Sequence, residues 1–106
     1  MRNTGVRVYG LVSGLPEKGY EELSQNHDLE SSSYENGALT IEFEGPYFFI
    51  EDFLDDLIGR LDDDGDGILD YIDNAEWVLI RHQIKKGAYE SRKISINDAL
   101  ERYSME

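Results

Sequence analysis

Two segments of the N-terminal half have apolar patterns that predict β-strands, one by its residue types and the other by alternation. Residues 6–12 (VRVYGLV) are rich in β-branched and aromatic side chains and end at a Ser-Gly-Leu-Pro turn signal. From Leu39 to Phe43 every second residue is apolar, and the residues between them are polar. Because successive side chains of a strand point to opposite faces, residues 38–44 predict a strand with one buried and one solvent-facing side. The Asn36-Gly37 pair before it is typical of a hairpin turn, but the sequence leaves the partner strand open.

A different spacing follows Gly45-Pro46 and predicts the main helix of the protein. Apolar residues recur there at intervals of three and four, at Phe49, Ile50, Phe53, Leu54, Leu57, Ile58 and Leu61. This is the pattern of an amphipathic helix with one apolar stripe, and we place the helix at about residues 48–61. The opposite side carries four acids, Glu51, Asp52, Asp55 and Asp56.

Two further segments are mostly polar. Residues 16–37 predict a short helix around residues 20–25 and then a loop. Near the C-terminus, residues 95–98 resemble a helix cap and predict a short helix at residues 98–103.

Residues 76–85 (EWVLIRHQIK) fit either a helix or a strand. Asp73-x-x-Glu76 resembles a capping box, which favours a helix. Apolar residues alternate from Val78 to Ile84, and several of them are β-branched, which favours a strand. We favour a strand that forms a β-hairpin with the segment after Gly87.

Together these elements predict an α+β fold in a single domain, residues 1–106. The chain is long enough to bury one hydrophobic core. We expect a mostly antiparallel sheet of about four strands, with the helix at about 48–61 packed on one face and a short C-terminal helix.

The charge is strongly unbalanced and concentrated in the middle of the chain. The formal net charge is −13, and residues 17–75 hold 18 acidic residues against only Lys18 and Arg60. Such a field repels nucleic acids and anionic membranes, and it attracts cations and basic proteins. We therefore expect a basic protein partner and no direct binding to nucleic acid or membrane. The chain has no long apolar run and no signal-peptide pattern, which predicts a cytoplasmic protein.

Residues 61–73 (LDDDGDGILDYID) place aspartates at positions 1, 3, 5, 9 and 12 counted from Asp62, with Gly67 at position 6. This spacing resembles the calcium-binding loop of EF-hand proteins. The resemblance implies that Gly67 allows a sharp turn and that Ile68 offers its backbone carbonyl, while the aspartates offer carboxylates. The implied ligands are Asp62, Asp64, Asp66, Ile68, Asp70 and Asp73.

The segment departs from the EF-hand pattern in two respects. Position 12 is Asp73, where EF-hands usually carry a glutamate that holds calcium with both oxygens. Only one such loop is present, whereas EF-hands usually work in pairs. The resemblance therefore implies a single structural Ca²⁺ site of modest affinity, or a Mg²⁺ site with more bound water. A solvated acidic loop and a partner-facing acidic patch are the alternatives.

An enzyme is the least supported class, because no nucleophile–base pair and no phosphate-binding loop is visible. Two functions remain. The first is a non-enzymatic calcium-binding protein that acts through protein–protein contact. The second is an acidic inhibitor whose carboxylates imitate nucleic-acid phosphates, similar in size and charge to anti-restriction, anti-CRISPR and nuclease-immunity proteins. In that case a basic enzyme surface would bind the loop aspartates together with Glu51, Asp52, Asp55 and Asp56.

Overall fold

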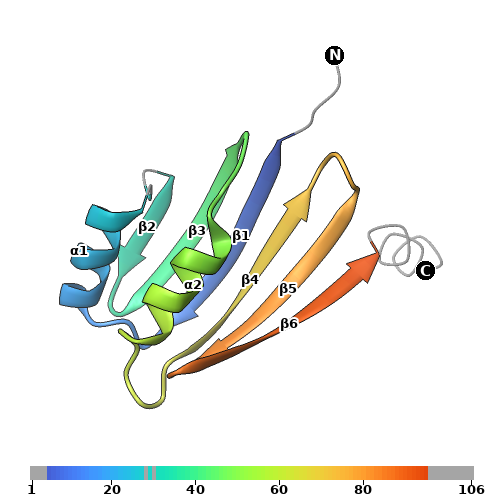
Figure 1. The fold of residues 1–106 in the computed structure, drawn as a ribbon. Coiled ribbons are helices and arrows are strands. Elements are labelled where there is room, and N and C mark those ends of the chain that lie inside the picture. The colour runs from blue at the N-terminus through green and yellow to red at the C-terminus, as the bar shows by residue number, and fades with distance from the viewer. Residues whose placement is uncertain (1–4, 28, 30, 96–106) are drawn as a thin grey trace, which may run out of the picture.

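One six-stranded antiparallel sheet is covered on one face by two helices (Figure 1). The computed structural model describes residues 5–27, 29 and 31–95. The strands lie in the order β2-β3-β1-β4-β5-β6, so β1 and β4 occupy the middle of the sheet. The elements in chain order are β1 (Val6–Ser13), α1 (Glu17–Asn26), β2 (Ser32–Glu35), β3 (Ala38–Gly45), α2 (Ile50–Ile58), β4 (Asp66–Asp73), β5 (Val78–Lys85) and β6 (Ala88–Ser95).

The α+β class and the antiparallel pairing are confirmed, but the prediction of about four strands is wrong. The two additional strands are β2 and β4. β4 contains most of the aspartate segment. Leu69 and Tyr71 lie on one side of this strand, and Ile68 and Asp70 lie on the other. The segment was interpreted as a loop because of its resemblance to the EF-hand loop, so this alternation did not lead to a strand prediction. β2 is a short, polar edge strand that lacks an apolar alternation.

Two-residue turns close the hairpins at both sides of the sheet. The ambiguous segment forms β5, and its predicted hairpin with β6 is confirmed. Lys85 pairs with Ala88, and Gly87 in the turn has a φ of 79°, a left-handed conformation that glycine adopts without steric cost. The Asn36-Gly37 turn joins β2 to β3, and both residues have positive φ, as a type I′ turn requires.

Helix α2 is shorter at both ends than the predicted helix at 48–61. It carries the chain over β1, because β3 before it and β4 after it both pair with β1. Helix α1 includes the helix predicted around residues 20–25 and is longer at both ends. The predicted C-terminal helix at 98–103 lies outside the described residues. In the described part of the chain, neither helix has the length and apolar character that a membrane crossing demands.

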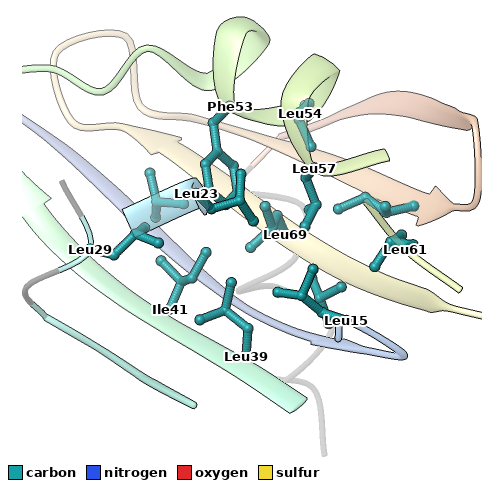
Figure 2. Close-up of a cluster of buried hydrophobic side chains, with 13 residues drawn as sticks. Leu15, Leu23, Leu29, Leu39, Ile41, Phe53, Leu54, Leu57, Leu61 and Leu69 are labelled. Carbon is teal, nitrogen blue, oxygen red and sulfur yellow. The ribbon is translucent and has the colours of Figure 1, made fainter. Parts of the chain in front are cut away.

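The hydrophobic core lies between the two helices and one face of the sheet (Figure 2). Leu23 of α1 and Phe53, Leu54 and Leu57 of α2 are fully buried there. Each such side chain contributes about 1.5–3 kcal/mol of transfer free energy. The sheet and its connections supply Val8, Val12, Leu15, Leu39, Ile41, Leu61, Leu69 and Ile84.

The opposite face of the sheet carries no helix in the described part of the chain, and we call it the open face. Side-chain alternation and the strand register define which residues lie on it. They are Arg7, Tyr9, Leu11 and Ser13 of β1; Ser33 and Glu35 of β2; Ala38, Thr40, Glu42 and Glu44 of β3; Asp66, Ile68, Asp70 and Ile72 of β4; Leu79, Arg81, Gln83 and Lys85 of β5; and Ala88, Glu90, Arg92 and Ile94 of β6.

Candidate functional site

Large hydrophobic side chains are exposed at three places in the described structure. Tyr47 and Phe49 lie together in the connection between β3 and α2. Leu11 and Ile68 are paired neighbours on the open face. Trp77 lies in the turn between β4 and β5. Exposed apolar clusters of this kind commonly mark contact surfaces.

Tyr47 and Phe49 form an edge-to-face aromatic pair with ring centroids 5.0 Å apart. They are 60% and 66% exposed, because Gly45-Pro46 ends the strand and three consecutive aromatic residues cannot all face the core. Phe48, between them, turns inward and packs against Phe43 and Phe53. We call Tyr47 and Phe49 the aromatic pair.

A pocket of about 500 Å³ opens beside the aromatic pair. Four aromatic residues line it, Phe43, Tyr47, Phe48 and Phe49. The complete lining is Asn26, His27, Phe43, Glu44, Gly45, Pro46, Tyr47, Phe48 and Phe49. Aromatic faces carry negative potential, so this combination suits a cationic side chain.

Three of the four acids predicted to bind a partner lie exposed beside this pocket in sequence. Glu51, Asp52 and Asp55 are on the outer side of α2 and make no ion pair or hydrogen bond with any described residue. Glu51 and Asp52 belong to the first helical turn, where the helix dipole stabilises negative charge. These three carboxylates are therefore available to a cation from outside.

Asp56, the fourth predicted acid, is half-buried and engaged by other side chains of the same chain. Arg60 Nε donates to its Oδ1 at 2.7 Å, and Asn26 Nδ2 and His27 Nε2 lie 3.2 and 3.1 Å from its Oδ2. Arg60 also pairs with Glu22 of α1. Burial raises the pKa of Asp56, but the hydrogen bonds from Asn26, Arg60 and His27 outweigh it and hold the pKa below the usual value for aspartate. Asp56 thus ties α1 to α2, and its half-buried carboxylate is already paired within the molecule.

The first part of the aspartate segment forms a tight turn against the end of β1. The Asp62 N–H donates to the Gly14 carbonyl, and the Gly65 N–H donates to the Asp62 carbonyl, both at 2.8 Å. A Cβ atom on Gly14 would lie 2.5 Å from the Gly65 Cα, so the backbone segments around these two residues approach as closely as only glycine permits. The carboxylates of Asp62, Asp63 and Asp64 are exposed on this turn.

The remaining predicted ligands lie along β4 and point to different sides of the sheet. Asp66 accepts a hydrogen bond from Ser13 Oγ at 3.1 Å, and Ile68 is on the open face. Asp70 is paired with Arg81, and Asp73 Oδ1 caps the next turn by accepting from the N–H groups of Ala75 and Glu76.

Gly67 is not at a sharp turn, in contrast to the role that the EF-hand resemblance implies. It lies within β4 opposite Val12. A Cβ atom there would come within 2.7 Å of Val12 Cα and of the Leu11 carbonyl oxygen. Close packing of β4 on β1 is therefore the structural reason for this glycine.

The predicted ligands do not fit one calcium ion in this fold. A strand rises about 3.4 Å per residue, so Asp66 and Asp73 are roughly 24 Å apart, whereas calcium ligands lie about 2.3–2.6 Å from the ion. Among the described residues, no three His, Cys, Asp or Glu side chains gather into a group that could hold a metal. The structure brings Asp62 and Asp64 into one turn and leaves Asp70 and Asp73 bound elsewhere.

The aromatic pair and its pocket were absent from the sequence predictions, although Pro-Tyr-Phe-Phe after Gly45 carries a usable signal. An aromatic run that follows a strand-breaking glycine and proline must expose some of its rings.

Comparison with protein-family models, curated proteins and solved structures finds no match. Functional inference therefore depends on the geometry of this chain alone.

Proposed function

We propose that this protein is a non-enzymatic acidic binding protein that covers a basic surface of another protein and blocks that surface from its anionic ligand. The carrying observation is the position of the exposed aromatic pair directly before the unpaired acids at the start of α2. An apolar anchor bordered by charge is the usual composition of a protein-binding hot spot. We call Tyr47, Phe49, Glu51, Asp52 and Asp55 the binding surface.

The two parts of the binding surface have different roles in this proposal. The carboxylates attract a basic partner over a distance and accelerate association. The aromatic pair and the pocket beside it then receive an arginine or lysine side chain through cation–π contact. Nucleic-acid-binding enzymes carry such basic side chains in their substrate channels, which supports the inhibitor form of the proposal. A cytoplasmic location is part of the proposal.

A short polyarginine peptide is a suitable first probe for the binding surface. We expect the triple variant Glu51→Gln, Asp52→Gln, Asp55→Gln to bind it more weakly and with a lower salt dependence than the wild type. The matched control is Glu35→Gln, Glu76→Gln, Glu90→Gln, which removes the same charge from other parts of the chain. If both triple variants lose the same affinity, the peptide responds only to net charge and the proposed surface is wrong.

The aromatic pair is tested with the same peptide. Tyr47→Ala with Phe49→Ala should weaken binding by about 1–2 kcal/mol, roughly five- to thirtyfold, even though no charge changes. Unchanged affinity would remove the anchor from the proposal.

Inhibition is tested separately by adding the protein to basic DNA-cleaving enzymes at rising salt. Inhibition that salt relieves is expected for its target, and failure across restriction, CRISPR and toxin nucleases would reject the inhibitor form.

A further inference from the structure

The second exposed hydrophobic pair lies at the centre of the open face, away from the binding surface. Leu11 of β1 and Ile68 of β4 face each other in the strand register and are 55% and 43% exposed. β1 and β4 are also the two central strands of the six. The midline of the sheet therefore runs between these two side chains.

Charges on the open face differ between its two sides. The β2 and β3 side carries only acids, Glu35, Glu42 and Glu44. The β5 and β6 side carries the bases Arg81, Lys85 and Arg92, with Glu90 as its one acid. Near the midline, charges are already paired, because Arg7 bonds to Glu44 and Asp70 to Arg81. The open face is thus almost balanced in charge, while the excess of acids lies on the helices and the Asp62–Asp64 turn.

We propose that the open face binds a second copy of this chain, with a twofold axis that runs parallel to the strands and above the β1–β4 midline. Such an axis exchanges left and right but keeps the position along the strands. It therefore places β1 over the partner's β4, and β3 over the partner's β5. Closed twofold dimers are the commonest assemblies of soluble proteins, and two sheets that pack face to face keep their strand directions within about 30°.

This axis makes the face complementary to itself. Leu11 and Ile68 share one row across the strands, so Leu11 of each copy lies over Ile68 of the other and four apolar side chains meet. Glu42 lies in the row that contains Arg81 and Arg92, so it approaches the basic side of the partner. A twofold axis perpendicular to the strands would instead place β3 over the partner's β3 and β5 over the partner's β5, so that acidic strands face acidic strands and basic strands face basic strands, which like-charge repulsion opposes.

The size of the face is adequate for a dimer. With strands about 4.8 Å apart and about 3.4 Å per residue, the five eight-residue strands and the four-residue β2 give a face on the order of 600 Å² in projection. The accessible area of a side-chain-covered face exceeds its projection, and a standard interface buries roughly 800 Å² per partner. The proposal does not depend on the function proposed above, because the dimer leaves the connection between β3 and α2 uncovered.

Sedimentation velocity over a concentration series tests the dimer. We expect a monomer–dimer equilibrium for the wild type, and a dissociation constant raised at least about tenfold by Leu11→Lys, because symmetry introduces the change twice. Lysine lowers the net negative charge, so increased overall repulsion cannot explain the loss. Phe49→Lys is the control, since it places the same charge at an exposed hydrophobic side chain outside the open face. A wild type that stays monomeric, or equal effects of the two variants, would overturn the proposal.

The direction of the axis is tested by charge exchange. Glu42 and Arg92 make no ion pair within the described part of the chain. Arg92 lies one strand beyond Arg81 in the row that Glu42 faces, so Glu42 of one copy approaches Arg92 of the other diagonally. Glu42→Arg alone and Arg92→Glu alone should each weaken the dimer, and the two together should restore part of the loss. Absence of recovery in the double variant would reject this axis.

Far-ultraviolet circular dichroism of each variant separates misfolding from lost association. Leu11→Lys should retain polyarginine binding if the open face and the binding surface are separate.

Discussion

Asp70 and Arg81 form a two-point ion pair across the neighbouring strands β4 and β5. Arg81 Nε lies 2.8 Å from Asp70 Oδ1, and Arg81 Nη2 lies 2.9 Å from Asp70 Oδ2. This parallel geometry is the strongest arrangement between a guanidinium and a carboxylate. Both oxygens of the residue that the EF-hand resemblance assigns to position 9 are therefore already engaged, and a calcium ion would have to replace the arginine.

Calcium should not stabilise this protein more than magnesium does. We expect millimolar calcium and magnesium to shift the thermal midpoint of the wild type equally, because only exposed surface charge is screened. Asp62→Asn with Asp64→Asn should respond in the same way, measured by circular dichroism with EDTA as the reference. A rise of several degrees with calcium alone, lost in the double variant, would show instead that residues 62–73 rearrange around the ion and that a metal stabilises the fold.

Most of the sheet could be predicted because its strands have one buried and one exposed side. β1, β3 and β5 show this in their apolar alternation, and α2 shows the corresponding helical spacing. β4 has the same alternation, with Leu69 buried and Asp70 on the open face. Its acids follow a known loop pattern, however, and local spacing alone cannot show that β1 supplies a partner along the whole segment. β2 could not be predicted, because only Tyr34 of its four residues packs against the core.

The candidate site was predicted in part for the same reason. Amphipathic spacing identifies the outer side of α2, so the exposure of Glu51, Asp52 and Asp55 follows from the pattern. Asp56 has the same position in that pattern, but α1 brings Asn26 and His27 to it. Contacts between elements distant in sequence cannot be read from periodicity, so the spacing could not show that Asp56 is hydrogen-bonded to Asn26 and His27.

Two phenylalanines four residues apart should separate stability from binding. Phe53 is fully buried and Phe49 is 66% exposed. Phe53→Ala should lower the free energy of unfolding by about 3–5 kcal/mol, because it leaves a cavity in the core. Phe49→Ala should change it by no more than about 0.5 kcal/mol and should weaken polyarginine binding. Urea unfolding measures the first quantity, and comparable losses of stability in both variants would contradict the positions of the two rings.

His82 should make the protein less stable as the solution becomes mildly acidic. The residue is 6% exposed, its Nδ1 lies 2.8 Å from Ser91 Oγ, and its Nε2 has no hydrogen-bond partner among the described residues. Burial lowers the pKa of His82, and the nearby charges of Asp70 and Glu51 oppose this without reversing it. The folded protein therefore binds this proton less readily than the unfolded chain does.

The sign of the effect follows from that difference in proton binding. The contribution of His82 is fully present above the usual histidine pKa of 6.5 and is lost as the pH falls through the lowered pKa of the folded state. We expect the free energy of unfolding, measured with urea, to decrease between about pH 7.5 and pH 5. His82→Leu combined with Ser91→Ala should reduce this decrease relative to Ser91→Ala alone. An unchanged pH profile would assign the decrease to other groups.

Asp55 and Asp56 are adjacent acids with opposite expected effects on stability. Asp56→Asn should lower the free energy of unfolding at neutral pH by about 1–3 kcal/mol, because it weakens charge-assisted hydrogen bonds from Arg60 and His27. Asp55→Asn should have almost no effect, since Asp55 is exposed and unpaired within the described part of the chain. Because the pKa of Asp56 is lowered on folding, its contribution is present above the usual value of 3.8 and is lost as the pH falls through the lowered pKa. The difference between the two variants should therefore disappear in strong acid. A difference that persists there would show that shape, and not charge, determines the role of Asp56 between the two helices.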